Sequence, residues 1–257
     1  SVVLLDHDDH HNHDKEATLV AFLAEDARQR APKEILMSSH SRWTSVLFDV
    51  DGTLVDSASV VTKVFGIVLS AKGFPVPEES ALMKYVGPPL WWSFTDLGFE
   101  GDLVEELVTS YRRTYIEFYL EPLPFPGITE LISLLHAAGF PLATATSKQQ
   151  PMALAQITHL GLEDSFDVVA GATPGRDSTK ASVIADALSR LEAQGHDVSR
   201  PVLIGDSIWD VEGAALAQID VIGVSWGYAQ PGDLDSCTAR VSSPQELAEL
   251  LGLSEPV

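Results

Sequence analysis

The chain has 257 residues, 45% of them hydrophobic, and carries a formal net charge of −21 at pH 7. Such a charge repels nucleic acid and anionic lipid, so the composition argues against both as partners. No apolar run reaches the roughly 18 residues that a membrane-spanning helix needs. Cys237 is the single cysteine, so no disulfide forms within the chain, which suits a reducing cytoplasm.

The first 36 residues differ in character from the rest. Residues 6–14 mix histidine and aspartate without an apolar period, which indicates a solvated, flexible tail or, alternatively, a weak metal-binding tract. Residues 17–24 have the pattern of a short amphipathic helix, without the basic stretch that opens a signal peptide. Met37 stands shortly before the first predicted strand. We therefore interpret residues 1–36 as an N-terminal extension.

The most informative segment follows this extension. An apolar run ends at Phe48, and Asp49, Asp51 and Gly52 come directly after it. A buried strand that ends in two carboxylates two residues apart places both at the carboxyl edge of a sheet, where open α/β folds bind ligands. Gly52 allows a sharp turn at that edge. One carboxylate of such a pair can act as a nucleophile while the other moves protons.

Residues 58–124 are predicted to be a helical insertion. Apolar residues recur at spacings of three and four from Val60 to Val68, and a second amphipathic stretch covers residues 102–119. Proline and glycine clusters separate and close these stretches. The insertion divides a core that we assign to residues 43–57 and 125–252.

After the insertion, short strands alternate with helices. Helices are expected at 128–138, 151–160, 180–193 and 211–217, and strands at 141–145, 166–170, 201–205 and 220–226. This alternation predicts an α/β fold with a Rossmann-like parallel sheet and helices on both faces.

Further polar residues follow or flank the predicted strands and helices. Thr146 and Ser147 follow one strand, Lys180 opens a helix, and Asp206 follows another strand with Asp210 four residues later. In a doubly wound sheet these positions converge on one crevice. Carboxylate oxygens are the ligands that Mg²⁺ prefers, and a divalent cation lets an anionic phosphate approach an anionic nucleophile.

The combination of Asp49-x-Asp51-Gly-Thr-Leu, Thr146, Lys180 and Gly-Asp206-x-x-x-Asp210 resembles the haloacid dehalogenase-like (HAD) hydrolase superfamily over residues 43–252. The resemblance implies that the insertion is a C1 cap. It also implies a phosphatase rather than a dehalogenase, because dehalogenases lack the second carboxylate.

The resemblance implies a role for each matching residue. Asp49 would attack phosphorus to form an aspartyl-phosphate, and Asp51 would serve as the general acid and base. Mg²⁺ would be held by Asp49, Asp206 and the backbone carbonyl of Asp51, with Asp210 supporting the metal site. The residues expected to hold the phosphoryl group are Thr146, Ser147 and Lys180.

A finer similarity is to phosphoglycolate phosphatase-like members, on Gly87-Pro-Pro-Leu, Phe125-Pro-Gly and Val224-Ser-Trp-Gly-Tyr. It makes a small phosphorylated metabolite the expected substrate, with 2-phosphoglycolate favoured, and a monomer or homodimer the expected assembly. Ala181 departs from the proline that many members have at that position. A 5′-nucleotidase, a sugar phosphomutase, a phosphonatase and a catalytically idle binding module remain alternatives.

Several residues also have plainer interpretations. Ser147 and Asp210 have the positions of helix caps. Tryptophans 91 and 92 are expected to pack inside the cap or to line the substrate pocket. Three cations of the insertion could meet a substrate anion or lie on a solvated helix face: Lys84, Arg112 and Arg113.

Overall fold

The computed structural model describes residues 41–175 and 177–253. The expectations for residues 1–36 lie outside these ranges. Within them, no helix is both long enough and apolar enough to cross a membrane.

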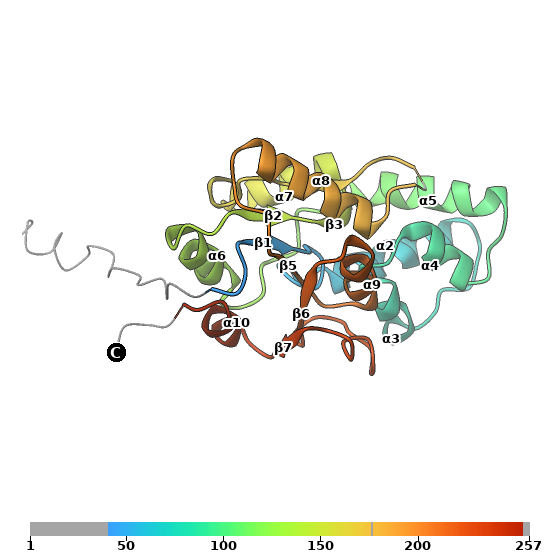
Figure 1. Cartoon of the computed structure of the whole chain (residues 1–257). Coiled ribbons are helices and arrows are strands. Elements are labelled where there is room, and N and C mark those ends of the chain that lie inside the picture. Colours follow the sequence, from blue (N-terminus) through green and yellow to red (C-terminus); the bar gives the residue numbers. More distant parts are fainter. Residues whose placement is uncertain (1–40, 176, 254–257) are drawn as a thin grey trace, which may run out of the picture. The chain divides into compact units, whose positions relative to one another are not determined.

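A five-stranded parallel sheet forms the core, with the strand order β2-β1-β5-β6-β7 (Figure 1). The central strand β5 pairs with its neighbour β1 from Ser45 opposite Pro201 to Phe48 opposite Ile204. The strands of the sheet are β1 (Ser45–Phe48), β2 (Leu142–Thr144), β5 (Pro201–Gly205), β6 (Asp220–Val224) and β7 (Ala239–Val241).

Helices cover both faces of this sheet. Buried residues of α8 (Lys180–Ala193) and α9 (Ile208–Ala217) join those of β1, β2 and β5 in one apolar cluster. On the other face, α6 (Ile128–Ala137) contacts α10 (Pro244–Leu250) (Figure 1). The predicted α/β class with a parallel sheet and helices on both faces is therefore confirmed.

The insertion has an apolar core of its own. It consists of α2 (Ala58–Ala71), α3 (Glu79–Leu82), the 3₁₀ helix η1 (Met83–Tyr85), α4 (Leu90–Asp96) and α5 (Asp102–Tyr115). Its buried residues form a cluster around Phe65, whose ring lies 4.9–5.6 Å from those of Tyr85, Phe94 and Tyr111. Burying this apolar stripe of α2 and α5 is what stabilises the insertion.

The chain enters and leaves the insertion through two adjacent segments. The Asp56 amide donates to the Leu123 carbonyl at 3.0 Å, and the Phe125 amide donates to the Leu54 carbonyl at 3.0 Å. These bonds join the segments as a short antiparallel pair. The connection lies only a few residues after Asp49, so it places the insertion close to the end of β1.

The strand predicted at 166–170 is wrong. Only Val168 bridges to β2 there, and the strand in this region is the two-residue β4 (Gly171–Ala172), paired with β3 (Thr146–Gln149). Side chains replace part of the ladder: the Thr144 hydroxyl donates to the Ala170 carbonyl and accepts from its amide, at 2.8 and 2.9 Å. The remaining elements in this region are α7 (Gln150–His159) and the 3₁₀ helix η2 (Glu163–Ser165).

Candidate active site

Two aspartates lie at the carboxyl ends of the neighbouring strands β1 and β5. The Asp49 amide continues the ladder by donating to the Ile204 carbonyl at 2.9 Å. Asp206 follows β5, and Asp210 lies in the first turn of α9. One carboxylate oxygen from each of the three residues lies within 4.8 Å of the others, and all three residues are buried.

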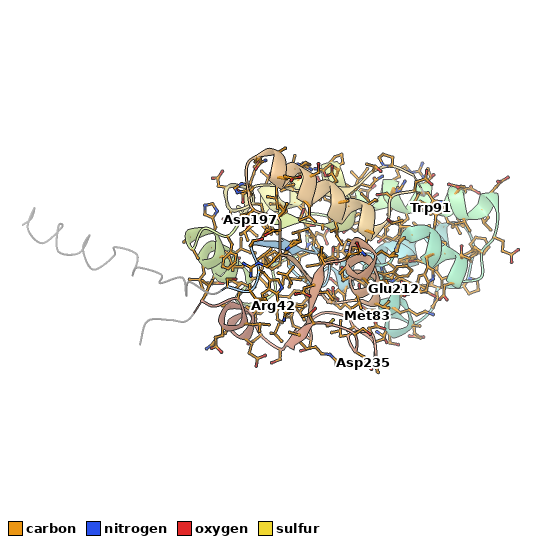
Figure 2. The ribbon with its side chains drawn as sticks, in the orientation of Figure 1. Arg42, Met83, Trp91, Asp197, Glu212 and Asp235 are labelled. Atoms are coloured by element: carbon orange, nitrogen blue, oxygen red, sulfur yellow. The ribbon has the colours of Figure 1, made fainter. Side chains whose placement is uncertain are left out.

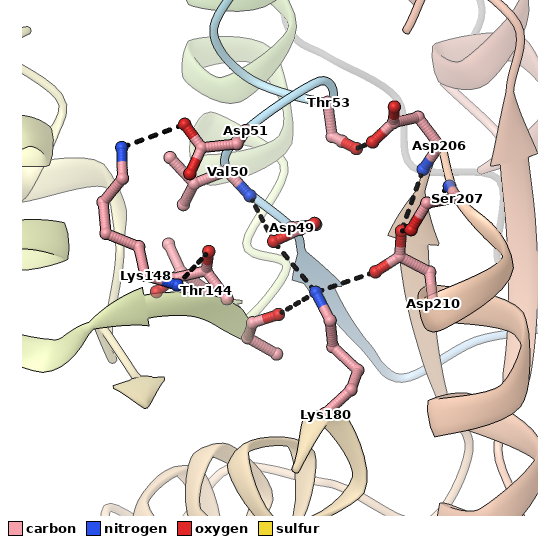
Figure 3. Close-up of polar contacts among 12 residues, drawn as sticks. Asp49, Val50, Asp51, Thr53, Thr144, Lys148, Lys180, Asp206, Ser207 and Asp210 are labelled. Carbon is pink, nitrogen blue, oxygen red and sulfur yellow. Dashed lines mark hydrogen bonds and ion pairs between the residues drawn. The ribbon is translucent and has the colours of Figure 1, made fainter. Parts of the chain in front are cut away.

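Lys180 joins this carboxylate cluster from the first turn of α8. Its ammonium nitrogen is 2.9 Å from Asp49 Oδ1 and 2.8 Å from Asp210 Oδ1, and it donates to the Ala145 carbonyl at 3.1 Å (Figure 3). Thr179 fixes the start of α8, because its hydroxyl accepts from the Ser182 amide at 3.2 Å. The helix cap therefore sets where the lysine enters the site.

Asp210 both caps a helix and contacts the lysine. Its Oδ2 accepts from the Asp206 amide at 3.2 Å, from the Ser207 amide at 3.0 Å and from the Ser207 hydroxyl at 2.7 Å. Its Oδ1 meets Lys180. Since both oxygens have partners, Asp210 is placed to orient Lys180 and the Asp206 loop.

Asp206 is held from two loops. Its Oδ1 accepts from the Thr53 hydroxyl at 3.2 Å, and its Oδ2 accepts from the Tyr228 amide at 2.8 Å. This packing depends on two glycines. A Cβ on Gly52, whose φ is 85°, would lie 2.3 Å from Asp206 Oδ2, and a Cβ on Gly227 would lie 2.3 Å from the Gly52 carbonyl oxygen.

Burial dominates the electrostatics of the carboxylate cluster. It raises the pKa of Asp49 to about 6 against the opposing effect of Lys180, and it raises the pKa of Asp206 well above its ordinary value. Burial also opposes the charge of Lys180, but Asp210 and Asp49 outweigh it and raise the lysine pKa. Three buried carboxylates thus face one lysine.

This imbalance makes the cluster suitable for a divalent cation. Oxygen donors with a surplus of negative charge are the set that Mg²⁺ takes in proteins. Asp49 and Asp206 would hold the ion, with Asp210 beside them. The side chain of Asp51 is not part of the cluster.

Asp51 instead pairs with a lysine to which the sequence analysis assigned no role. The Lys148 ammonium donates to Asp51 Oδ1 at 3.0 Å (Figure 3). It also donates to Gln156 Oε1. It lies 5.6 Å from the ring centre of Tyr115, a residue of the insertion. Only 2% of the lysine side chain is exposed. Its position two residues after Thr146, at the same sheet edge, is the sequence signal for this pair.

A cavity of about 200 Å³ opens over Asp49 and Asp51. Thr146 and Ser147 line it. The Thr146 hydroxyl accepts from the Lys148 amide at 3.2 Å, and the N-cap of α7 is Gln149 rather than Ser147. The insertion contributes its aromatic wall, which consists of Tyr85, Trp91, Tyr111 and Tyr115.

The two tryptophans of the insertion have different surroundings. Trp91 lines the cavity, and Figure 2 shows it where α4 and α5 lie beside each other. The Trp92 ring instead lies 5.2 Å from that of Trp209 on α9. The insertion and the core therefore touch on one side through these two rings.

Residues 46–224 match the family model described as haloacid dehalogenase-like hydrolase. The chain belongs to this family. The resemblance inferred from the motifs is thus confirmed, and so is the expectation that the chain is an enzyme of the HAD type.

Relatives of this HAD chain include proteins named as a kinase and as phosphatases. The chain is 38% identical over 215 residues to the tyrosine-protein kinase PtkA of Mycobacterium tuberculosis, and the match covers 81% of this chain and 72% of PtkA. It is 33% identical over 204 residues to a phosphoglycolate phosphatase of Agrobacterium fabrum, covering 75% of this chain and 84% of that enzyme. A crystal structure described as a predicted phosphatase from Clostridium acetobutylicum superposes with a TM-score of 0.74 at 33% identity, covering 80% and 97% of the two chains.

Proposed function

We propose that this HAD enzyme is a Mg²⁺-dependent phosphatase that hydrolyses a small phosphomonoester, with 2-phosphoglycolate the favoured substrate. The observation that carries the proposal is the buried Asp49 carboxylate. Its Oδ1 accepts from the Val50 amide at 2.8 Å and meets Lys180, whereas none of the described residues donates to its Oδ2. Asp49 also lines the cavity, so Oδ2 is the candidate nucleophile.

In the first step, the Asp49 oxygen bonds to phosphorus as the bond from phosphorus to the leaving oxygen breaks. Asp51 gives its proton to the leaving oxygen. Thr146 and Lys180 hold the transferring group, and Lys180 offsets part of the charge that the carboxylates place around it. Bound Mg²⁺ would supply further charge neutralisation between the phosphate and the carboxylates.

In the second step, water attacks the phosphorus of the aspartyl-phosphate. Asp51, now a carboxylate, takes a proton from that water. The bond between phosphorus and the Asp49 oxygen breaks, which releases inorganic phosphate and restores the carboxylate. The insertion walls the cavity with aromatic rings, which limits access of bulk water to the intermediate.

The proposal includes a cytoplasmic location, because phosphorylated metabolites occur there and the single cysteine needs no oxidising compartment.

The experiment that tests this function is phosphate release from a panel of about a hundred phosphorylated metabolites with Mg²⁺. A phosphatase of small metabolites releases phosphate from a few of them, with 2-phosphoglycolate expected among the best. Preference for nucleoside monophosphates would favour the 5′-nucleotidase alternative. Isomerised sugar phosphate without free phosphate would favour the mutase. No turnover of any compound would contradict the proposal.

A second candidate is phosphoryl transfer to protein tyrosine, supported by the 38% identity to PtkA. Incubating the enzyme with ATP and Mg²⁺ and probing for phosphotyrosine distinguishes it from the proposed phosphatase. ADP and phosphotyrosine appearing together, without release of phosphate from small esters, would favour the kinase.

We expect Lys148 to position Asp51 for proton transfer to the leaving oxygen, because the Lys148 ammonium forms an ion pair with the Asp51 carboxylate. Lys148→Met should lower kcat/KM for ethyl phosphate, which reports the steps up to departure of the leaving group, by about 10- to 100-fold, since a positioned acid typically contributes about 10²- to 10⁴-fold. For p-nitrophenyl phosphate the loss should stay within about threefold, because its leaving group departs without a proton.

The matched control is Lys63→Met, which removes a lysine paired with Glu121 at 3.7 Å on the insertion. Lys63→Met should keep the wild-type kcat/KM for both substrates. An equal loss on both substrates in Lys148→Met would indicate a merely structural lysine and contradict the positioning role.

A further inference from the structure

One cation of the insertion lines the cavity over Asp49 and Asp51. It is Arg112 on α5, whose guanidinium carbon lies 4.5 Å from the ring centre of Trp91. This stacking holds the planar group against the cavity wall. Among the described residues, no carboxylate forms an ion pair with Arg112.

The other two cations of the insertion that the sequence offered, and the lysine of the cavity wall, are paired or lie elsewhere. Lys84 pairs with Asp96 at 2.7 Å on the surface of the insertion. Arg113 is exposed and does not line the cavity. Lys148 lines the cavity but pairs with Asp51. Among the described residues that line the cavity, Arg112 is therefore the cation that is placed to bind an anionic group of a substrate.

The surroundings of Arg112 favour an anion. Burial lowers the pKa of Arg112. The charge of Glu105, on the same helix, acts in the opposite direction and is the smaller effect. A half-buried guanidinium is stabilised by a carboxylate or phosphate that accepts two of its N–H groups together. The chain as a whole carries a charge of −21, so binding of an anion depends on local cations such as Arg112.

We propose that Arg112 binds a second anionic group of the substrate, so that the enzyme selects phosphomonoesters carrying a carboxylate or a second phosphate. The inference rests on the proposed function, which places the reacting phosphoryl group at Asp49. The cavity of about 200 Å³ restricts such a substrate to a few carbon atoms between its two anionic groups. This assigns the selectivity to one residue of the insertion.

Small phosphomonoesters that differ in their second group test the proposal on the wild-type enzyme. We expect kcat/KM for 2-phosphoglycolate to exceed that for the neutral ethyl phosphate by about 10- to 100-fold, the value of a charged hydrogen-bonded contact. O-phosphoethanolamine, whose second group is a cation, should be the poorest substrate. Ethylene glycol bisphosphate shows whether a phosphate serves in place of the carboxylate.

The variant Arg112→Gln should lose this preference. Its kcat/KM for 2-phosphoglycolate should fall about 10- to 100-fold, mostly through KM, towards its value for ethyl phosphate. Arg112→Lys, which keeps the charge but loses the planar fork, should show an intermediate loss. The adjacent Arg113→Gln is the matched control and should keep the full wild-type preference.

The outcomes separate this inference from the function on which it rests. Phosphate release that is insensitive to the charge of the second group, in the wild type, would overturn the role of Arg112 and leave the phosphatase intact. Equal preference in Arg112→Gln and the wild type would do the same. No phosphate release from any of these esters or from p-nitrophenyl phosphate would instead overturn the phosphatase, and the inference with it.

Discussion

Asp49→Asn is expected to reduce phosphate release by at least about 10⁴-fold, because an amide oxygen cannot form the aspartyl-phosphate. The substitution keeps the size of the side chain, and Lys180 retains its contacts with Asp210 and the Ala145 carbonyl. The fold should therefore persist. The measurement is phosphate release from p-nitrophenyl phosphate, together with the thermal melting temperature of each protein.

The matched control for this variant is Asp186→Asn, which alters an exposed carboxylate of α8 that pairs with Arg190. It should retain wild-type turnover. Acid quenching of the wild type with labelled substrate should trap radioactivity on the protein, and Asp49→Asn should trap none. Near-normal turnover in a folded Asp49→Asn protein would exclude Asp49 as the nucleophile.

The positions of Asp49 and Asp206 followed from local sequence pattern. Each ends an apolar run, and carboxyl ends of neighbouring parallel strands meet at one sheet edge. The observed neighbours β1 and β5 bring these two ends together. The pattern did not predict the pairing of Asp51 with Lys148. That contact joins the loop after β1 to strand β3, 97 residues further along the chain, and depends on where β3 lies.

Residue type alone does not predict which cation of the insertion lines the cavity. The position of each residue around the helix axis predicts part of it. Val108, Tyr111 and Tyr115 are buried on α5, and Arg112 follows Val108 by four residues. It thus lies at the border of the buried stripe, whereas Arg113 lies further round the helix. Which helix border faces the cavity depends on the packing of the insertion, and a single sequence does not specify that.

The strand expected at 166–170 failed for a different reason. Its residues have a suitable apolar pattern, but the Thr144 hydroxyl and the Asp167 carboxylate, which accepts from the Leu142 amide at 2.8 Å, occupy backbone groups that a ladder would use. Side-chain competition of this kind is local in space and distant in sequence. The segment therefore runs beside β2 without forming a regular strand.

The second large expected effect concerns the divalent cation. Chelation with EDTA should stop phosphate release, and Mg²⁺ in excess should restore it, because Asp49 and Asp206 repel an anionic substrate unless their charge is offset. Asp206→Asn should reduce turnover by at least about 10²-fold and raise the Mg²⁺ concentration needed for half-maximal rate. Asp235→Asn, at an exposed carboxylate paired with Arg240, is the control and should behave as the wild type.

Mg²⁺ binding can also be measured without catalysis, through the thermal stability of the protein, because the pKa values of Asp49 and Asp206 are raised. In the metal-free protein these carboxyls hold protons more tightly when folded, so they lower stability as pH rises: Asp49 does so from about pH 4 to about 6, and Asp206 adds to the loss in the same direction. Mg²⁺ competes with those protons. At pH 7.5, saturating Mg²⁺ should raise the melting temperature by about 5–10 °C, and the rise should be smaller at pH 5.

The two measurements constrain each other. A melting temperature that rises with Mg²⁺ in the wild type and Asp235→Asn but not in Asp206→Asn would locate the ion at the carboxylate cluster without reference to catalysis. Turnover that persists in EDTA, with no effect of Mg²⁺ on melting at pH 7.5, would contradict the metal site. In that case protons on Asp49 and Asp206, whose pKa values are raised, would have to neutralise the charge that Lys180 leaves unbalanced.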